Sequence, residues 1–385
     1  MRHGLLITEN HDILCTMERP HGQQDVSPDL HGAPRTAITA DHLRRAFIRV
    51  CRNRRHFPDD ADIWHLCFHR TTRLPQMLRD LNHGLWRLSP LQLVRRADGE
   101  RVAVWGAEDA VVLTALTYAL TPLLPVSPLC SHVAGNGGKT ALQNTIRNVR
   151  NAGFRFVCRL DIRQYYASIR RDILMAQLRQ YVTHPVHLSL LSQFHDYTVE
   201  DGGTFHTPSR GISRGCALSP LLAAFHLREI DDHFARCRRV RYVRYMDDFL
   251  LLTRTRWHLR HAVRERKQFL SQYGFTEHPD KTFTEPVKKG TDWMGYQLTE
   301  RGLNGPAPRA VNNMLQKLHR LYEQARRRRE NPASRVAAYL QRWCLWASLA
   351  SGLAENRPSL RHPFRNPDCP AVMIKDHEHR RHIGS

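Results

Sequence analysis

VRYVRYMDDFLLL, residues 240–252, is the stretch that decides the fold. Strand-forming residues enter and leave it, and two adjacent carboxylates, Asp247 and Asp248, interrupt them. We therefore predict an apolar β-hairpin with two aspartates at its tip. Burying carboxylates in so apolar a setting is costly unless a cation neutralises them, and hard divalent ions such as Mg²⁺ prefer such oxygens. For an Asp-Asp pair taken alone, an acidic β-turn is the simpler interpretation.

A third carboxylate follows another predicted strand. Residues 154–160, FRFVCRL, approximately alternate and end at Asp161, a pattern typical of a half-buried strand. Nucleotidyl transfer needs an activated 3′-hydroxyl and charge neutralisation, which two Mg²⁺ ions about 3.5–4 Å apart provide when carboxylates from separate segments converge. Asp161 and Asp247 meet this need if their strands are neighbours. Because successive strand side chains point to opposite faces, we expect Asp247 to be the ligand and Asp248 to assist.

Charge points to a polyanionic partner. The 385 residues hold 58 Lys and Arg against 36 Asp and Glu, a net charge of +22. We favour nucleic acid over a membrane because we find no apolar run long enough to span a bilayer, no signal peptide and no isolated basic amphipathic anchor. We expect a soluble, cytoplasmic protein. The nine cysteines form no C-x-x-C pair, which argues against a disulfide framework and against a zinc ribbon.

The N-terminal third is predicted to be helical and basic. Residues 1–37 indicate an extended or poorly ordered arm, and Thr39 is a candidate N-cap of a helix running through Cys51. The polar face of that helix is either an ordinary solvated face or a phosphate-contacting one, and its excess of arginine favours the second. These arginines are Arg44, Arg45, Arg49, Arg52, Arg54 and Arg55.

Further elements are predicted along the chain from periodicity and turn residues. We expect helix over 60–86, a basic hairpin with its turn at 98–99, a buried helix over 109–120, helices near 168–181, 220–234 and 258–273, and a turn at 201–203. The Gly-rich segment 135–140 is not a P-loop, because Val133 occupies the place of its first glycine; we interpret it as a turn opening a helix over 141–149. The βαββ order of the central part predicts an α+β sheet covered on one face.

Beyond Pro308 the pattern turns helical. Two apolar stripes at helical spacing, one from Val311 to Tyr322 and one from Val336 to Trp346, are assigned to the core, and the arginine run 326–329 to the exposed face. The His-rich segment 376–382 is interpreted as a mobile tail in preference to a metal site.

Five motifs in order resemble those of reverse transcriptases of the bacterial, group II intron-like branch. They are YMDD (245–248), DIRQYY (161–166), GISRGCALSPLL (211–222), GF with KT (274–275 and 281–282) and WMGY (293–296). The resemblance covers about residues 78–300 and implies a right-hand polymerase fold with an antiparallel βαββ palm. It divides the chain into an arm (1–37), a basic helical extension (38–77), fingers (78–150, partly interleaved with the palm), palm (151–300), helical thumb (301–355) and a polar tail (356–385).

The resemblance also implies site residues for an RNA-directed DNA polymerase. Asp161, Asp247 and Asp248 would bind two Mg²⁺ ions, for which Mn²⁺ is a possible substitute, with the Ile162 carbonyl as an extra ligand. Tyr166 falls where the family's bulky steric gate excludes a 2′-hydroxyl; a packed aromatic beside Tyr165 is the alternative.

Other positions would hold the nucleotide and the nucleic acid. Arg95, Arg96, Arg101 and Lys281 would hold the triphosphate of the incoming dNTP, and Arg214 and Gly215 would line its pocket. The segment 293–296 resembles the primer grip and comprises Trp293, Met294, Gly295 and Tyr296. The expected nucleic-acid contacts are Arg44, Arg45, Arg49, Arg52, Arg326, Arg327, Arg328 and Arg329.

Two positions depart from the family's pattern, since Ser213 and Arg214 stand where proline and glutamine are usual. The sequence motifs typical of retron and diversity-generating enzymes are missing, and the chain ends before the extra modules of intron-encoded proteins. These two observations favour a free-standing enzyme. We expect it to copy a cognate structured noncoding RNA into cDNA in anti-phage defence. Enzymes of small group II-like mobile elements and a catalytically silent RNA-binding module are the alternatives. The template, the priming mode and the oligomeric state stay open.

Overall fold

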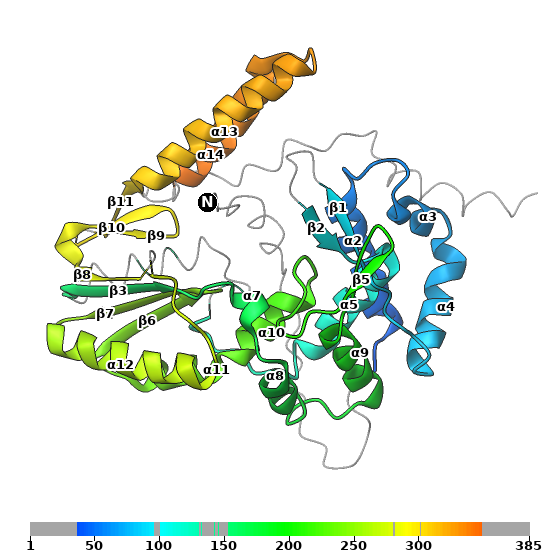
Figure 1. The fold of residues 1–385 in the computed structure, drawn as a ribbon, viewed down its shortest axis with the longest axis horizontal. Coiled ribbons are helices and arrows are strands. Elements are labelled where there is room, and N and C mark those ends of the chain that lie inside the picture. Colours follow the sequence, from blue (N-terminus) through cyan, green and yellow to red (C-terminus); the bar gives the residue numbers. More distant parts are fainter. Residues whose placement is uncertain are drawn as a thin grey trace, which may run out of the picture. The chain divides into compact units, whose positions relative to one another are not determined.

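The computed structural model describes residues 37–95, 101–130, 132, 142, 145, 153–279, 282–300 and 302–348. The chain divides after Ala310 into two compact units, each described here by itself. The predicted tail, the Gly-rich turn 135–140, nearly all of the predicted arm and most of the helix 141–149 lie outside the described residues. The first unit mixes helices with three sheets, which confirms the predicted α+β class (Figure 1).

Three helices open the first unit: α2 (Ala40–Arg54), α3 (Asp62–Phe68) and α4 (Arg70–Asn82). The predicted N-cap is confirmed, because Thr39 Oγ1 accepts a hydrogen bond from the His42 backbone N–H at 3.1 Å and the His42 side chain accepts one from Thr39 N–H. These helices pack around α5 (Ala107–Leu120), which is buried almost all round, as predicted for 109–120.

A small sheet follows the order β2-β1-β4-β5. The strands β1 (Leu91–Arg95) and β2 (Arg101–Val104) form the predicted antiparallel hairpin, whose turn lies outside the described residues. Two short strands complete the sheet, β4 (Val199–Asp201) and β5 (Thr204–His206). Gly202 and Gly203 join them with positive φ, which confirms the predicted turn.

The central sheet contains the decisive hairpin. Its order is β6 (Val240–Tyr245), β7 (Asp248–Thr253), β3 (Phe156–Asp161) and β8 (Phe283–Pro286), all antiparallel. Two helices, α11 (Arg228–Arg236) and α12 (Arg256–Gln272), pack on one face, as Figure 1 shows. The hairpin and the covered βαββ sheet are therefore confirmed.

The sequence predicted that β3 would be half-buried. In the structure, all residues from Val157 to Asp161 are buried. It lies between β7 and β8 inside the sheet. Its second face carries charged residues that pair with one another, as described below.

Two predicted helices are broken. The segment 168–181 forms α7 (Tyr165–Ser168) and α8 (Arg171–Leu178), because the Tyr166 and Ile169 carbonyls accept hydrogen bonds from the backbone of Ile212 and Gly211, at 2.9 and 3.0 Å, instead of continuing a helix. The segment 220–234 forms α10 (Leu218–His226) and α11, which separate at Leu227.

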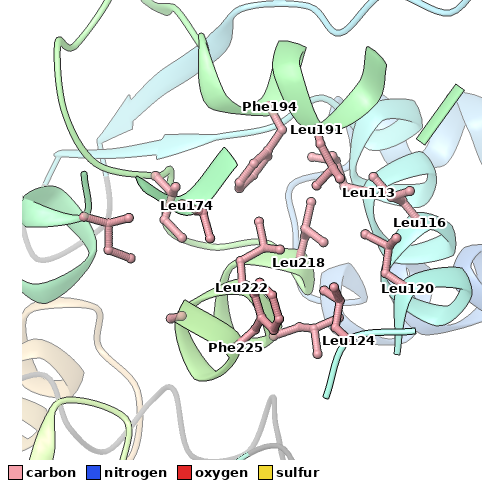
Figure 2. Close-up of a cluster of buried hydrophobic side chains, with 14 of the residues drawn as sticks. Leu113, Leu116, Leu120, Leu124, Leu174, Leu191, Phe194, Leu218, Leu222 and Phe225 are labelled. Atoms are coloured by element: carbon pink, nitrogen blue, oxygen red, sulfur yellow. The ribbon is translucent and has the colours of Figure 1, made fainter. Parts of the chain in front are cut away.

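A buried cluster joins these helices to α5 and to α9 (Pro185–His195), a helix that the sequence had not indicated (Figure 2). Side chains from α5 and the turn after it, and from α8, α9 and α10, interdigitate there. They are Leu113, Leu116, Leu120, Leu124, Leu174, Leu191, Phe194, Leu218, Leu222 and Phe225. This core holds the start of α10 and thereby the loop 211–217 between β5 and α10, which carries several predicted site residues.

A third sheet ends the first unit, with the order β11-β10-β9. Its strands are β9 (Thr291–Trp293), β10 (Tyr296–Thr299) and β11 (Gly302–Pro306), preceded by the 3₁₀ turn η2 (Val287–Lys289). Because β11 pairs with β10, the predicted palm–thumb boundary at 300/301 runs through this sheet.

The described part of the second unit, up to residue 348, comprises most of α13 (Pro308–Arg327) and α14 (Pro332–Ala347). The prediction that their apolar stripes are core is wrong: α14 has no buried residue and α13 only Ala325, while Leu315 is 54% exposed. A pair of helices that packs against nothing else can cover only the side chains along their line of contact, so most of each apolar stripe stays accessible. Residues 326–329 are exposed, as predicted. None of the helices in the described ranges is long and apolar enough to cross a bilayer.

Candidate active site

The hairpin tip is a two-residue turn. Tyr245 ends β6 and pairs with Asp248, the first residue of β7, so Met246 and Asp247 form the turn itself. Met246 has φ 54°, a conformation that costs energy for a residue other than glycine. Both of its backbone polar groups are held, since Met246 N–H donates to His132 Nδ1 at 3.1 Å and its carbonyl accepts from Arg244 Nη1 at 3.1 Å. These bonds stabilise the turn that presents Asp247.

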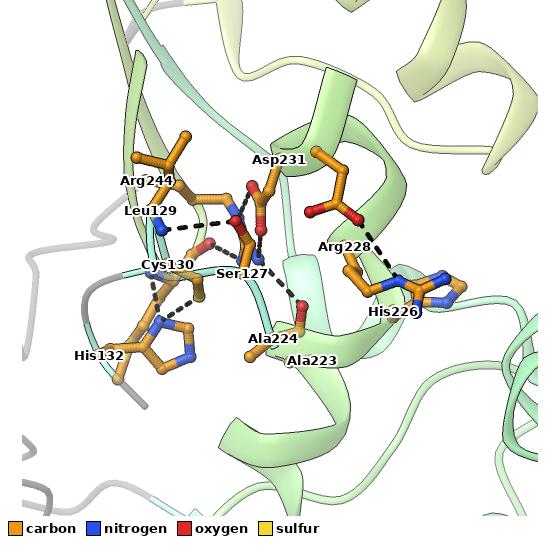
Figure 3. Close-up of polar contacts among 12 residues, drawn as sticks. Ser127, Leu129, Cys130, His132, Ala223, Ala224, His226, Arg228, Asp231 and Arg244 are labelled. Carbon is orange, nitrogen blue, oxygen red and sulfur yellow. Dashed lines mark hydrogen bonds and ion pairs between the residues drawn. The ribbon is translucent and has the colours of Figure 1, made fainter. Parts of the chain in front are cut away.

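A buried ion pair between Arg244 and Asp231 supports this turn from the sheet face that α11 covers (Figure 3). Arg244 and Asp231 of α11 are both fully buried, and Arg244 Nη2 and Nε donate to the two carboxylate oxygens at 2.5 and 2.8 Å. Arg244 also donates to the Ala224 carbonyl, and Tyr242 donates to Asp231. Burial lowers the pKa of Arg244, but the Asp231 carboxylate outweighs this effect and raises that pKa well above its ordinary value. Burial raises the pKa of Asp231, and the Arg244 charge opposes that effect. The pair connects α11 to the hairpin tip.

His132 is the second support. Its Nδ1 accepts from Met246 N–H, so the ring proton is on Nε2, which donates to the Pro220 carbonyl at 3.3 Å. Complete burial, together with the Arg244 charge, lowers the pKa of His132 to about 3. The ring is therefore neutral at physiological pH and acts as a hydrogen-bond acceptor for the turn.

Acid is expected to destabilise the protein through His132. The unfolded chain takes up this proton near pH 6.5 and the folded chain only near pH 3, so the free energy of unfolding falls as the pH drops through that interval. We expect His132 to contribute a loss of about 1–2 kcal/mol between pH 7 and pH 5. Urea unfolding of wild type and His132→Asn at both pH values measures this, because asparagine keeps an acceptor but does not titrate. Equal losses in the two proteins would contradict the assignment.

The three predicted carboxylates converge. Asp161 ends β3 and lies directly opposite Asp248 in the register of β3 and β7. Residues opposite one another in an antiparallel pair point to the same face, so strand pairing places Asp248, and not Asp247, on the face of Asp161. Asp247 joins them from the turn, where its carbonyl accepts a hydrogen bond from Ile162 N–H at 3.2 Å. The strand-alternation argument had favoured Asp247 as the ligand with Asp248 assisting, because it could not include the partner strand.

A buried arginine connects Asp248 to the third sheet. Arg159, two residues before Asp161, donates to Asp248 Oδ1 from Nη2 at 3.1 Å and from Nε at 3.3 Å. Its Nη1 donates to the Asp292 carbonyl at 2.6 Å, and Asp292 Oδ1 accepts from Gly295 N–H at 3.2 Å. Burial lowers the pKa of Arg159, but the Asp248 and Asp292 carboxylates outweigh this effect and raise that pKa above its ordinary value. Asp248 is therefore oriented by a guanidinium ion inside the protein.

Tyr166 lies beside this group on α7. It is partly exposed, whereas Tyr165, whose hydroxyl donates to the Ala223 carbonyl at 2.6 Å, is fully buried. Burial and the charge of Asp247 raise the pKa of Tyr166, and the Arg214 guanidinium carbon lies 6.0 Å from its ring centroid. The structure thus brings Tyr166, Asp247 and Arg214 together. Gly211 permits this, since a Cβ there would lie 2.6 Å from the Cα of Ala167.

The loop that carries Arg214 and Gly215 is tied to the small sheet. Trp105, just after β2, donates from Nε1 to Ser213 Oγ at 3.0 Å, and Ser219 Oγ donates to the Ser213 carbonyl at 2.6 Å. Ser213, one of the two departures from the family pattern, therefore joins this loop to the end of β2. Gly215 has φ 81°, a backbone conformation that favours glycine.

Two of the predicted phosphate-binding arginines, Arg95 and Arg101, lie at the turn end of the β1–β2 hairpin. Arg95 and Arg101 are register partners, and like charges in opposite positions are unfavourable unless an anion compensates them. Arg101 forms an ion pair with Asp201 of β4. Arg96 and Lys281 lie outside the described residues.

The segment 293–296 forms a tight hairpin turn. Trp293 and Tyr296 are paired and almost fully buried, while Met294 and Gly295 both have positive φ, the signature of a type I′ turn. Trp293 and Tyr296 therefore anchor the segment, and Met294 and Gly295 form its tip.

The arginine face of α2 is partly structural. Arg54, expected to be exposed with the others, is buried and donates to the Trp105 carbonyl at 2.7 Å, so that assignment is wrong. Arg44 and Arg45 pair with Asp41, and Arg52 is exposed. Arg49 is partly exposed on the same helix.

Several residues of this site were not predicted, namely His132, Arg159, Asp231, Arg244 and Asp292. The signal for Arg159 and Arg244 was present in the sequence, because each is a charged residue inside an otherwise apolar strand. Such residues are buried only with a partner. The partners come from distant segments and could not be read from the pattern.

Part of this chain is similar to known proteins. Residues 114–298 match the family model described as reverse transcriptase (RNA-dependent DNA polymerase). A curated relative, the putative COX1/OXI3 intron 1 protein of Saccharomyces cerevisiae, is 19% identical over 287 residues, covering 59% of this chain and 34% of that protein. The chain thus spans about a third of the length of the curated relative it matches.

Among solved structures, telomerase from Candida albicans in complex with a TWJ fragment of telomeric RNA has a TM-score of 0.35 and 15% identity, covering 48% of this chain and 38% of that one. The family match over residues 114–298 and the four-stranded sheet together confirm the predicted right-hand polymerase fold.

Proposed function

We propose that this chain is an RNA-directed DNA polymerase that synthesises cDNA by nucleotidyl transfer. One observation carries the proposal: Asp161 and Asp248 lie opposite each other on one sheet face, and Asp247 joins them from the turn, within the region that matches reverse transcriptases. Carboxylates from two strands meet at the tip of an apolar hairpin, an arrangement whose charge a divalent cation would compensate.

The donor set fits Mg²⁺, and Mn²⁺ as a substitute. Asp161, Asp247, Asp248 and the Ile162 carbonyl offer only oxygen atoms, which these hard ions prefer. When bound, two such ions would activate the primer 3′-hydroxyl and neutralise charge on the transferring phosphate. Arg159 orients the Asp248 carboxylate, while His132 and Arg244 hold the turn that carries Asp247. These residues position the carboxylates.

The other predicted residues surround this centre in the proposal. Arg95, Arg96, Arg101 and Lys281 hold the triphosphate, Arg214 and Gly215 line the nucleotide pocket, and residues 293–296 contact the primer end. The exposed arginines of α2 and those at 326–329 contact the nucleic acid backbone.

The experiment that tests the activity is primer extension on an RNA template with dNTPs and Mg²⁺. Wild type is expected to extend the primer, and the double variant Asp247→Ala plus Asp248→Ala is expected not to. If wild type incorporates nothing on any template, including RNA that co-purifies with it, the alternative of a catalytically silent RNA-binding module replaces this proposal.

Tyr166 is expected to select deoxynucleotides. Replacing it by alanine removes the ring that would collide with a 2′-hydroxyl, so the preference for dNTP over rNTP should fall by about 10- to 100-fold, measured as the ratio of kcat/KM values. Tyr166→Phe keeps the ring and should keep the preference. Unchanged rejection of rNTPs by Tyr166→Ala would show instead that this ring only packs against Tyr165.

For the biological role, we propose a cytoplasmic enzyme that copies a cognate structured noncoding RNA in anti-phage defence. The net charge of +22 supports a large polyanionic partner. Sequencing the nucleic acid that co-purifies with the protein tests this: one abundant noncoding RNA is expected. A random mixture would contradict a dedicated template, and an adjoining intron RNA would favour the mobile-element alternative.

A further inference from the structure

Three potential metal ligands meet on the helical layer of the central sheet. One nitrogen of His233, the thiol of Cys237 and a carboxylate oxygen of Glu265 all lie within 4.8 Å of one another. His233 lies in the last turn of α11, Cys237 is the C-cap residue that follows this helix, and Glu265 belongs to the neighbouring helix α12. Both helices cover the sheet face opposite to Asp161 and Asp248. The buried Arg244 points toward α11, so the next residue, Tyr245, points to the other face. Asp248 is the register partner of Tyr245 and therefore shares that other face. The cluster is therefore separate from the proposed catalytic centre.

The spacing of the ligand atoms suits a tetrahedral ion. His233 Nε2 lies 3.3 Å from Glu265 Oε1 and 3.9 Å from Cys237 Sγ. Bonds of about 2.0–2.3 Å to tetrahedral zinc place neighbouring ligand atoms about 3.3–3.6 Å apart. The nitrogen–oxygen separation already lies in this range. The nitrogen–sulfur separation is longer, and the Cys237 thiol donates to the His233 carbonyl at 3.4 Å, a bond that it would exchange for the ion.

The surroundings hold two of the three ligands in place. The His233 ring packs at 5.0 Å, between centroids, against both Phe234 and Phe269. Glu265 Oε2, the second oxygen of the carboxylate, lies 3.1 Å from His261 Nδ1. A histidine that orients a ligating carboxylate is a common outer-sphere arrangement in metal sites. The His261 ring in turn stacks on Trp257.

Burial and charge also fit a cation. His233 and Glu265 are 29% and 25% exposed, so an ion can reach them while the site keeps part of its shielding. With a thiolate and a carboxylate, a divalent ion would leave the site neutral.

We propose that His233, Cys237 and Glu265 bind a zinc ion that links α11 to α12, with His261 orienting Glu265. The mixed nitrogen, sulfur and oxygen set selects Zn²⁺ over Mg²⁺, which takes oxygen ligands. On binding, the Cys237 thiol releases its proton to solvent, and a water molecule takes the fourth position. The link stabilises the helical layer that carries Asp231 and so supports the hairpin.

The test is metal titration of the full-length, untagged chain in excess Mg²⁺. Wild type is expected to bind one Zn²⁺ that raises its Tm, and Co²⁺ in its place should give a thiolate-to-metal charge-transfer band. Cys237→Ser should lose that band and bind Zn²⁺ at least about 10-fold more weakly, the effect of losing about 1.4 kcal/mol. Glu265→Gln, which keeps the side-chain shape, should weaken binding similarly and serves as the second variant if Cys237→Ser unfolds.

Two controls make the result specific. Cys344→Ser removes an exposed thiol in the second unit and should behave as wild type. The variant Asp247→Ala plus Asp248→Ala should bind Zn²⁺ normally, so this test does not depend on polymerase activity. Absence of zinc binding by wild type, or equal zinc binding by wild type and Cys237→Ser, would overturn the proposal and leave His233, Glu265 and His261 as an ordinary ion-pair cluster.

Discussion

Replacing Arg244 by methionine is expected to lower the free energy of unfolding by about 3–5 kcal/mol, the usual cost of removing one partner of a buried ion pair. The change leaves the Asp231 carboxylate buried and fully inaccessible without its main partner. It also removes the hydrogen bonds to the Ala224 and Met246 carbonyls. Urea unfolding at neutral pH measures the loss.

The matched control is Arg241→Met on the same strand. Arg241 is exposed, so its replacement should change the free energy of unfolding by no more than about 0.5 kcal/mol. A second change, Asp231→Leu, made together with Arg244→Met, should recover part of the loss, because it removes the uncompensated charge. Equal stability of Arg244→Met and Arg241→Met would contradict the role given to this ion pair.

Asp161→Asn is expected to reduce nucleotide incorporation on the order of 10³-fold, because catalytic metal ions contribute several kcal/mol to the transition state and each ~1.4 kcal/mol is tenfold in rate. Asparagine keeps the shape of the side chain but removes the charge that would bind the ion. Single-turnover incorporation with saturating dNTP measures the effect.

Asp172→Asn is the control for this change. Asp172 is an exposed aspartate of α8 that pairs with Arg170. It should keep the wild-type rate, and both variants should bind the primer–template with wild-type affinity. An Asp161→Asn protein that incorporates nucleotides within a fewfold of wild type would show that Asp161 is not a metal ligand.

Local patterns in the sequence predicted the parts of the fold that depend on neighbours in the chain. The hairpin around Asp247, the strand before Asp161 and the N-cap at Thr39 were all predicted correctly, because alternation and capping are properties of a few consecutive residues. The helix breaks at Ile169 and Leu227 were not, since tertiary contacts impose them.

The predictions for the candidate site also succeeded where they depended on consecutive residues and failed where they depended on a distant segment. Motif order identified the three carboxylates, but the pairing of Asp161 with Asp248 depends on which strand lies beside β3. The alternation rule applied to one strand alone therefore could not place Asp248. Likewise, His132 lies 114 residues from Met246, its hydrogen-bond partner, and no periodicity connects them.

The apolar stripes of α13 and α14 show a limit of a different kind. Their helical spacing was recognised correctly, yet periodicity reports which residues share a face and not what covers it. Leu315 and Leu345 are each more than half exposed. Arg54 shows the converse, since a charged residue on an apparently solvated face is buried against Trp105.

The most direct measurement is DNA synthesis by the full chain from a DNA primer on an RNA of known sequence, with dNTPs, in Mg²⁺ and in EDTA. We expect a DNA product complementary to the RNA in Mg²⁺ and none in EDTA, since the site holds only oxygen donors that bind hard divalent ions. Failure to copy any RNA in Mg²⁺ or Mn²⁺, or undiminished synthesis in EDTA, would contradict a metal-dependent RNA-directed DNA polymerase built on Asp161, Asp247 and Asp248.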